Sequence, residues 1–174
     1  MAPKVILYAE DDPDDVVLLQ RACKKAGVSL RVSIVNDGYE AINYLSGSGK
    51  YADRDQFPLP ALVLLDIHMP RRSGLDVLKW IREHPALDIL VVLMFTSSDL
   101  ELDVYSSYRL GANGYLVKPS SPARLVELVK ALNDFWLNFN QLPSVLPSPA
   151  HPSLPLIRSE RKFEGSQASS RGAA

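Results

Sequence analysis

Carboxylates follow two short apolar runs of this sequence. Glu10 and Asp11 come directly after residues 5–9, and Asp66 comes directly after residues 61–65. In open parallel sheets, ligands bind in the crevice outside the carboxyl ends of the strands. Adjacent carboxylates repel each other unless a cation lies between them, and Mg²⁺ takes a few carboxylates together with waters and phosphate oxygens. The pattern therefore predicts a magnesium site formed by Glu10, Asp11 and Asp66.

A hydroxyl and an ammonium group follow two further apolar runs. Thr96 comes after residues 89–95, and Lys118 comes after residues 114–117. Each has an ordinary alternative, a strand-end hydroxyl or a solvated surface lysine. Aligned with the acids, they are better suited to bind phosphoryl oxygens, and Lys118 is expected to pair with Asp66. Asp66 could instead cap a helix, but Ser73 lies closer to the next helix, which leaves Asp66 as a nucleophile that forms an aspartyl phosphate.

The segments that position these residues have the pattern of an α/β sheet. Strands are expected near residues 4–9, 30–35, 61–66, 89–95 and 113–117, and helical periodicity fills the gaps up to about residue 140. Asp12 with Pro13 opens the first helix and Gly27 closes it. Residues 30–35 alternate between apolar and polar side chains, which predicts a strand at the sheet edge. Residues 46–60 are expected to form a long polar loop.

Capping residues support the remaining helices. Asp37 with Glu40 and Ser98 with Glu101 have the spacing of a capping box, in which a side chain at the start of a helix bonds the backbone three residues later. Residues 1–142 are predicted to form one folded domain. From residue 143 to residue 174 the chain is rich in Pro, Ser, Ala and Gly, and this composition is typical of a disordered tail. No second domain that reads DNA fits there.

Composition restricts the partners. The net charge is −1 and the isoelectric point is near 6.3, whereas nucleic-acid and membrane surfaces attract basic proteins. The N-terminus does not have the pattern of a signal peptide, and no apolar run reaches bilayer length. The single cysteine, Cys23, allows no internal disulfide, and it shares a helical stripe with Val16, Leu19 and Ala26, so we expect it in the core of a cytoplasmic protein.

Four motifs together resemble the receiver domain of two-component response regulators. They are the acidic pair Glu10-Asp11, the segment LLDIHMP around Asp66, the segment MFTSS around Thr96 and the segment GYLVKP around Lys118. They stand in that family's order and spacing, over about residues 3–140. The resemblance implies a CheY-like, flavodoxin-like sheet of five parallel strands in the order 2-1-3-4-5, with helices on both faces.

The resemblance also implies roles for these residues. Asp66 would accept a phosphoryl group from a sensor histidine kinase. Mg²⁺ would be held by Asp11, Asp66 and the backbone carbonyl of His68, with Glu10 acting through water. Thr96 and Lys118 would hold the phosphoryl oxygens.

Two further features are implied by the resemblance. Tyr115 would rotate together with Thr96 on activation. The Lys118–Pro119 bond would be cis, which is permitted chiefly before proline.

The long segment 46–60 and the ending DFWLNFNQLP are similar to the single-domain subgroup that serves phytochrome-type sensor kinases. His68 and Ser98 stand at positions that vary in the family and affect the lifetime of the phosphate.

Two other functions remain open at this point. A phosphatase of the haloacid-dehalogenase type uses the same Asp and Mg²⁺, but it has an acid catalyst two residues after the nucleophile, where this chain has His68. A phosphorylation-independent scaffold would not need the complete set of acids, Thr and Lys. We therefore expect a phosphoacceptor, with possible self-dephosphorylation, rather than a turnover enzyme.

The last predicted helix suggests a homodimer. One broad apolar stripe can cover the sheet, and it contains Leu125, Leu128, Val129, Leu132, Phe135, Trp136 and Phe139. Val126 and Leu137 lie together outside this stripe, so they predict an exposed apolar patch for a partner surface. The alternative is that residues 136–139 fold over the domain's own core. A symmetric dimer is the commonest assembly that such a patch could form.

Overall fold

The computed structural model describes residues 4–143 and contains one parallel sheet of five strands. The strands are β1 (Val5–Ala9), β2 (Arg31–Val35), β3 (Leu62–Leu65), β4 (Val91–Thr96) and β5 (Gly114–Val117). Their order is β2-β1-β3-β4-β5, which confirms the predicted topology and the edge position of β2. In register, Ala9 lies beside Leu65 and Thr96 lies beside Val117, so the carboxyl ends of four strands meet at one edge.

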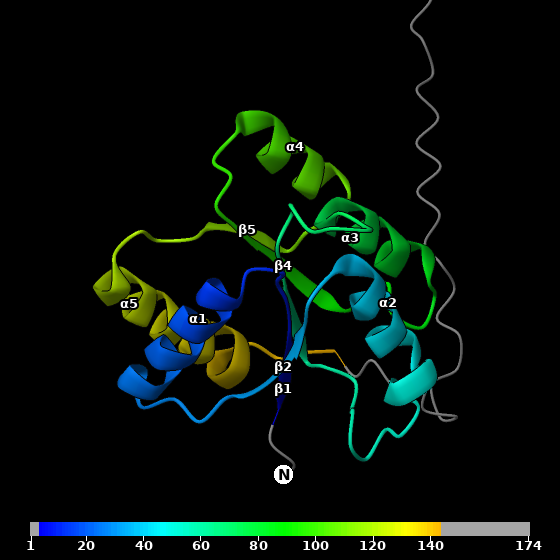
Figure 1. Cartoon of the computed structure of the whole chain (residues 1–174), viewed down its shortest axis with the longest axis horizontal. Coiled ribbons are helices and arrows are strands. Elements are labelled where there is room, and N and C mark those ends of the chain that lie inside the picture. The colour runs from blue at the N-terminus through cyan, green and yellow to red at the C-terminus, as the bar shows by residue number, and fades with distance from the viewer. Residues whose placement is uncertain (1–3, 144–174) are drawn as a thin grey trace, which may run out of the picture.

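Helices cover both faces of the sheet, as predicted. Figure 1 shows α1 and α5 on one side of the strands, α2 and α3 on the other, and α4 beside β5. Their bounds are α1 Pro13–Ala26, α2 Gly38–Ser46, α3 Gly74–Glu83, α4 Glu101–Arg109 and α5 Pro122–Leu132, with short helices η1 Gly49–Tyr51 and η2 Asn133–Phe139. None of the helices within residues 4–143 is long and apolar enough to cross a membrane. The predicted tail, apart from Pro143, lies outside the described residues.

The three central strands are apolar throughout because both of their faces are buried. Alternate residues point to opposite sides: Leu7 and Val63 belong to the core under α2 and α3, whereas Ile6 and Leu64 belong to the core under α1 and α5. All four side chains are at most 2% exposed. The rigid strands between these two cores fix the positions of the polar residues that follow them.

The predicted helix starts are correct except for one. The side chains of Asp12, Asp37 and Ser73 cap α1, α2 and α3, and Gly27 ends α1 in the left-handed conformation. Ser98 does not cap α4. That helix begins at Glu101 without a side-chain cap, and the Ser98 hydroxyl instead donates to the Asp103 carboxylate at 2.6 Å. The loop before α4 is longer than the capping spacing assumes, so Ser98 joins the loop to a side chain of the first helical turn rather than capping the helix backbone.

The predicted cis bond is also wrong. All peptide bonds in the described part of the chain are trans, including Lys118–Pro119. For a bond before proline the two isomers differ by only about 0.5–1 kcal/mol, so the local sequence does not decide between them.

The segment 46–60 is packed more closely than its polar sequence predicts. Tyr51 is buried, and its ring lies 5.1 Å from the rings of both Tyr44 and Phe57. The Arg54 guanidinium donates hydrogen bonds to the carbonyls of Tyr44, Leu45 and Phe57 at 2.8, 2.8 and 3.2 Å. These carbonyls lie at the C-terminus of α2 and in the segment itself, so Arg54 joins the segment to the helix.

The end of the last helix corrects the predicted apolar patch. Residues 133–139 form a π-helix, in which the hydrogen bonds span five residues and each residue turns the chain by a smaller angle than in an α-helix. The faces of residues 133–139 are therefore shifted, and Leu137 is buried. Val126 lies before this shift, in α5, and is partly buried against the core under α1 and α5. Phe135 and Phe139, which the α-helical projection placed on the core side, are 55% and 78% exposed.

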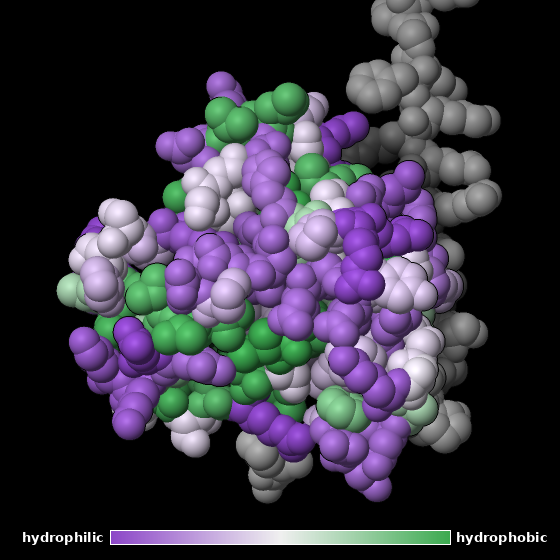
Figure 2. Space-filling model, viewed as in Figure 1, coloured by the Kyte–Doolittle hydropathy of each residue, from purple (hydrophilic) through white to green (hydrophobic). Residues whose placement is uncertain are grey.

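Cys23 lies at the border of the core rather than inside it. It is half-buried and lines a groove of about 190 Å³ between α1 and β2, together with Leu19, Leu30 and Val32. Figure 2 shows apolar surface in this region. The predicted stripe on α1 is correct, but α1 packs mainly on α5 and leaves the face of the edge strand partly uncovered.

Replacement of Arg54 tests the role of the packed segment. Arg54→Ala should lower the free energy of unfolding by about 1–3 kcal/mol, because a charged donor that satisfies buried carbonyls contributes on that scale. Denaturant unfolding measures the change. Arg21→Ala, which removes an exposed arginine of α1, is the control and should change stability by less than about 0.5 kcal/mol. Equal effects of the two substitutions would contradict this role for Arg54.

Candidate functional site

Glu10 is a buried carboxylate at the carboxyl end of β1. It is 1% exposed, and its oxygens accept hydrogen bonds from the Tyr8 hydroxyl at 2.8 Å and from the Asp12 backbone N–H at 3.1 Å. Burial raises the pKa of Glu10, although its hydrogen bonds from Lys118 and Tyr8 act in the opposite direction. Glu10 therefore binds a proton more readily than an exposed carboxylate does.

Asp66 occupies the corresponding position after β3. It is 5% exposed, and its backbone N–H donates to the Ala9 carbonyl at 3.1 Å, so it continues the pairing with β1. The start of α3 lies directly against it: a Cβ at Gly74 would lie only 2.0 Å from the Asp66 carbonyl oxygen. Only glycine allows the two backbones to come this close, and this close packing keeps the loop between Asp66 and α3 near the sheet.

The three acids form one cluster that opens to solvent. Carboxylate oxygens of Glu10, Asp11 and Asp66 all lie within 4.8 Å of one another, and Asp11 is exposed whereas the other two are buried. Oxygen ligands, few in number and accessible from one side, suit Mg²⁺, because this ion keeps several of its waters. His68 lies on the loop after Asp66 with its side chain exposed. The donor set of this cluster thus fits a hard divalent cation.

Lys118 brings a positive charge to the same cluster. Its Nζ lies 2.5 Å from Glu10, 2.7 Å from Asp15 and 3.8 Å from Asp66. Its backbone N–H donates to the Thr96 carbonyl at 2.8 Å, so the sheet pairing positions it. Burial would lower the pKa of Lys118, but the hydrogen bonds to Asp15 and Glu10 outweigh burial and raise it, so the ammonium stays charged.

Thr96 is the last residue of β4, and Tyr115 is the second residue of β5. Thr96 is fully buried, and its hydroxyl accepts a long hydrogen bond of 3.4 Å from the Ser98 N–H. The Tyr115 hydroxyl donates to the Ser98 carbonyl at 3.0 Å. Burial raises the pKa of Tyr115, and the bond to Ser98 opposes this only in part, so the phenol is neutral. Both side chains thus contact the same loop, the one that leads to α4.

Two residues of the site were missed at the sequence level. Asp15 looked like one of the first-turn acids that stabilise a helix N-terminus, and nothing in its spacing points to Lys118, which is 103 residues away. Tyr8 lies in an apolar strand and looked like core. Its signal was its hydroxyl, because a buried hydroxyl requires a partner, and that partner is Glu10.

Comparison with known proteins gives a family match over most of the chain. Residues 6–130 match the model of the response regulator receiver domain. The response regulator Rcp1 from Synechocystis sp. is 36% identical over 142 residues, which cover 82% of this chain and 95% of Rcp1. The crystal structure of the Mn²⁺-bound form of Rcp1 superposes with a TM-score of 0.73.

Two further solved structures are similar over the same region. The response regulator RPA3017 in red light signaling of R. palustris has a TM-score of 0.78 and 35% identity, covering 81% of this chain and 99% of its own. The phosphorylated cyanobacterial phytochrome response regulator RcpA has a TM-score of 0.75 and 36% identity, covering 82% of this chain and 100% of its own. The likeness thus extends over the sheet, the helices and the acidic cluster.

The raised pKa of Glu10 predicts how the cluster binds metal at different pH values. Protonation removes a negative charge from the cluster, so the affinity for Mg²⁺ should fall as the pH is lowered, beginning at a higher pH than for unperturbed carboxylates. Calorimetric titration of the purified protein measures this. Glu10→Gln should bind Mg²⁺ more weakly at pH 8 but lose less affinity on acidification. The same pH profile in both proteins would contradict the role of Glu10.

Proposed function

We propose that this chain, which belongs to the family of response regulator receiver domains, accepts a phosphoryl group on Asp66 from a sensor histidine kinase. Phosphorylation of an aspartate is the general mechanism of this family, whose members act in signalling rather than as turnover enzymes. The observation that carries the assignment to Asp66 is its place in one cluster with the two other carboxylates, 3.8 Å from the Lys118 ammonium. Such a site combines a nucleophile, oxygen ligands for a metal and a cation for phosphoryl oxygens.

Each residue of the acidic cluster would have a separate role in phosphoryl transfer. One carboxylate oxygen of Asp66 forms the new P–O bond while the P–N bond to the kinase histidine breaks, and the histidine nitrogen keeps the electron pair. Asp11, Asp66 and the His68 carbonyl would hold Mg²⁺, with Glu10 acting through water. The bound ion would neutralise charge on the phosphoryl oxygens. Receiver domains bind divalent metals, and the acidic cluster supports Mg²⁺ as the ion used here.

Phosphorylation would change the conformation of the loop before α4. The new phosphoryl oxygens give Thr96 and Lys118 additional hydrogen-bond acceptors, so Thr96 would move toward Asp66. Tyr115 contacts the same loop through the Ser98 carbonyl and would rotate with Thr96. The proposed product is a changed surface around α4 and β5. His68 and Ser98 lie beside the site and would affect the rate at which the phosphate is lost.

The kinase partner is proposed to be a phytochrome-type sensor kinase. This rests on the similarity to RcpA and to RPA3017, two response regulators of light signalling, over more than 80% of the chain. We also propose a cytoplasmic location. The haloacid-dehalogenase alternative has no support, because the family match is to receivers. The alternative of a phosphorylation-independent scaffold has no support either.

Replacement of the acceptor tests the proposal directly. Wild-type protein with Mg²⁺ and a small acyl phosphate should take up about one acid-labile phosphoryl group per chain, whereas Asp66→Asn should take up none, because its amide cannot act as the nucleophile. Mass spectrometry measures the labelling. Asp76→Asn, in the exposed first turn of α3, is the control and should be labelled like the wild type. Stoichiometric labelling of Asp66→Asn would show that another residue is the acceptor.

We also propose that the chain forms a homodimer through α5, η2 and the exposed edge of β5. An open groove of about 380 Å³ lies between β5 and α5, lined by apolar Val117 and Leu128 and by the charged pair Arg124 and Glu127. Phe135 and Phe139 add exposed aromatic surface further along the same helix. A surface that carries apolar groups and both charges can complement itself across a two-fold axis.

Negative charges introduced on this surface by substitution should dissociate the dimer. Phe135→Glu combined with Phe139→Glu should convert the protein to monomers, because buried carboxylates would be left without partners at the interface. Light scattering measures the mass with and without phosphorylation. Leu102→Glu, at a 73% exposed leucine of α4, is the control and should leave the dimer intact. A wild type that is monomeric in both states would contradict the dimer but not the phosphoacceptor chemistry.

A further inference from the structure

Arg71 has an unusual backbone conformation close to the acceptor. Its φ of 64° makes it the only non-glycine residue with a positive φ among residues 4–143. A long side chain rarely adopts this left-handed conformation, and residues that do so often lie at functional sites, where surrounding contacts maintain the strain. Arg71 lies five residues after Asp66, on the loop of residues 67–73 that leads to α3.

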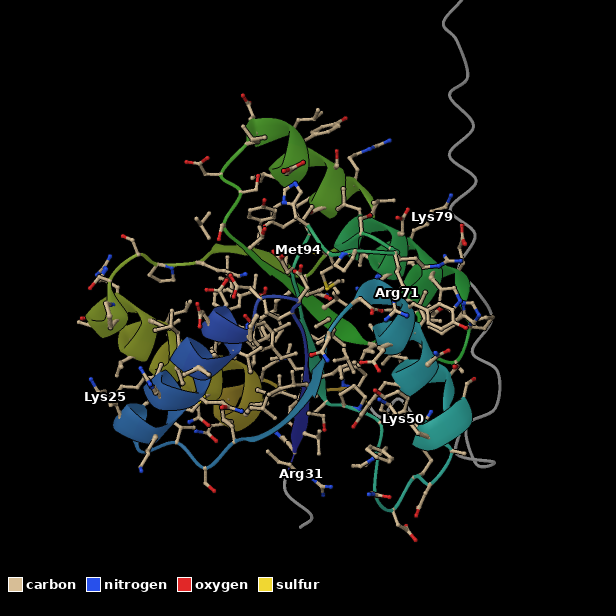
Figure 3. All side chains as sticks on the ribbon, viewed as in Figure 1. Lys25, Arg31, Lys50, Arg71, Lys79 and Met94 are labelled. Carbon is tan, nitrogen blue, oxygen red and sulfur yellow. The ribbon has the colours of Figure 1, made fainter. Side chains whose placement is uncertain are left out.

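Arg71 forms an ion pair with Asp37, the residue that caps α2. The Arg71 guanidinium donates to one carboxylate oxygen of Asp37, and the other oxygen accepts from the Glu40 N–H at 2.8 Å, which caps α2. Asp37 is 2% exposed, so it is a buried acid whose charge is compensated by Arg71. The guanidinium also lies 5.6 Å from the centre of the Tyr39 ring. Figure 3 shows Arg71 at the N-terminal end of α2.

The backbones of the two loops touch at the same place. A Cβ at Gly38 would lie 2.3 Å from the Arg72 carbonyl oxygen, so the chain before α2 packs directly on the loop of residues 67–73. At its base, this loop is closed by the bond from the Gly74 N–H to the Ile67 carbonyl at 2.9 Å. The loop is thus fixed to β3 at its base and to α2 at its tip, and His68 lies between these two contacts.

We propose that Asp37 and Arg71 are positioning residues, which hold the loop of residues 67–73 in the conformation that binds the divalent cation. The inference rests on the proposed function, because it assumes that the His68 carbonyl is a metal ligand. Neither side chain touches the cluster of Glu10, Asp11 and Asp66. Their effect is on the loop: the ion pair maintains a strained turn that would otherwise relax and move the carbonyl.

Two substitutions remove the ion pair while preserving local structure. Arg71→Asn keeps a residue that tolerates a positive φ, and Asp37→Asn keeps a side chain that caps a helix. The two have opposite effects on charge. Loss of Arg71 removes a cation from the neighbourhood, and by Coulomb's law alone this would tighten Mg²⁺ binding, whereas loss of Asp37 alone would weaken it. Positioning predicts that both variants bind more weakly.

The experiment is a calorimetric titration of unphosphorylated protein with Mg²⁺, for the wild type, both variants, the double variant and Arg72→Asn. Arg72 is the exposed neighbour on the same loop and serves as the control for charge. We expect a three- to tenfold weaker affinity for Arg71→Asn and Asp37→Asn, no further loss in the double variant, and an unchanged or tighter affinity for Arg72→Asn. Amide hydrogen exchange at Met69 and Arg72 should accelerate in the three variants that lack the ion pair.

Two results would overturn the proposal. One is an unchanged or tighter affinity of Arg71→Asn in a folded protein, because charge would then explain the data. The other is additive losses in the double variant, because the two residues would then act separately. The outcome is distinct from the test of the proposed function: at saturating Mg²⁺ all these variants should still be labelled on Asp66, whereas failure of the proposed function would leave the wild type unlabelled.

Discussion

The site depends on the compensation of several negative charges by one partly buried ammonium. Glu10, Asp15 and Asp66 all lie within 4 Å of Lys118 Nζ, and Glu10 and Asp66 are almost completely buried. Without a cation, carboxylates this close would repel each other and take up protons. Lys118 allows them to remain together before a metal or phosphoryl group is bound.

The parallel sheet makes this compensation possible. Glu10 and Lys118 are 108 positions apart in the sequence, but both follow the carboxyl ends of strands of the same sheet, β1 and β5. The register of the strands fixes the edge at which these ends meet. The loops after the strands differ in how they are held. The loop after β3 is fixed by Gly74 and by the Asp37–Arg71 pair, whereas the loop after β4 is connected through Ser98 to Thr96 and Tyr115. The first arrangement suits a constant metal site, and the second suits a segment that changes on phosphorylation.

Errors in the sequence-based predictions occurred where local patterns compete with packing. The Ser98 spacing matched a helix cap, but the hydroxyl donates to the side chain of Asp103 in the first turn of α4 and does not cap the helix backbone. The α-helical projection failed at Leu137 because the chain changes to a π-helix, which no residue type there signals. The polar segment 46–60 is held by Arg54, whose partners are backbone carbonyls. Backbone acceptors are the same for every residue type, so the sequence does not reveal such contacts.

The sequence by itself determined the strands, their order through the family resemblance, and the positions of Glu10, Asp11, Asp66, Thr96 and Lys118 at the strand ends. It could do so because apolar runs of strand length and polar residues at their ends are local patterns, and parallel strands bring those ends together. Only the tertiary structure decided that Asp15 and Tyr8 belong to the site, and that Arg71 is bonded to Asp37. The pairs Asp15–Lys118 and Arg71–Asp37 join side chains of different elements, so their geometry depends on how helices and loops pack rather than on spacing along the chain. Tyr8 and Glu10 are only two residues apart, but their bond forms because both side chains are buried together at the end of β1.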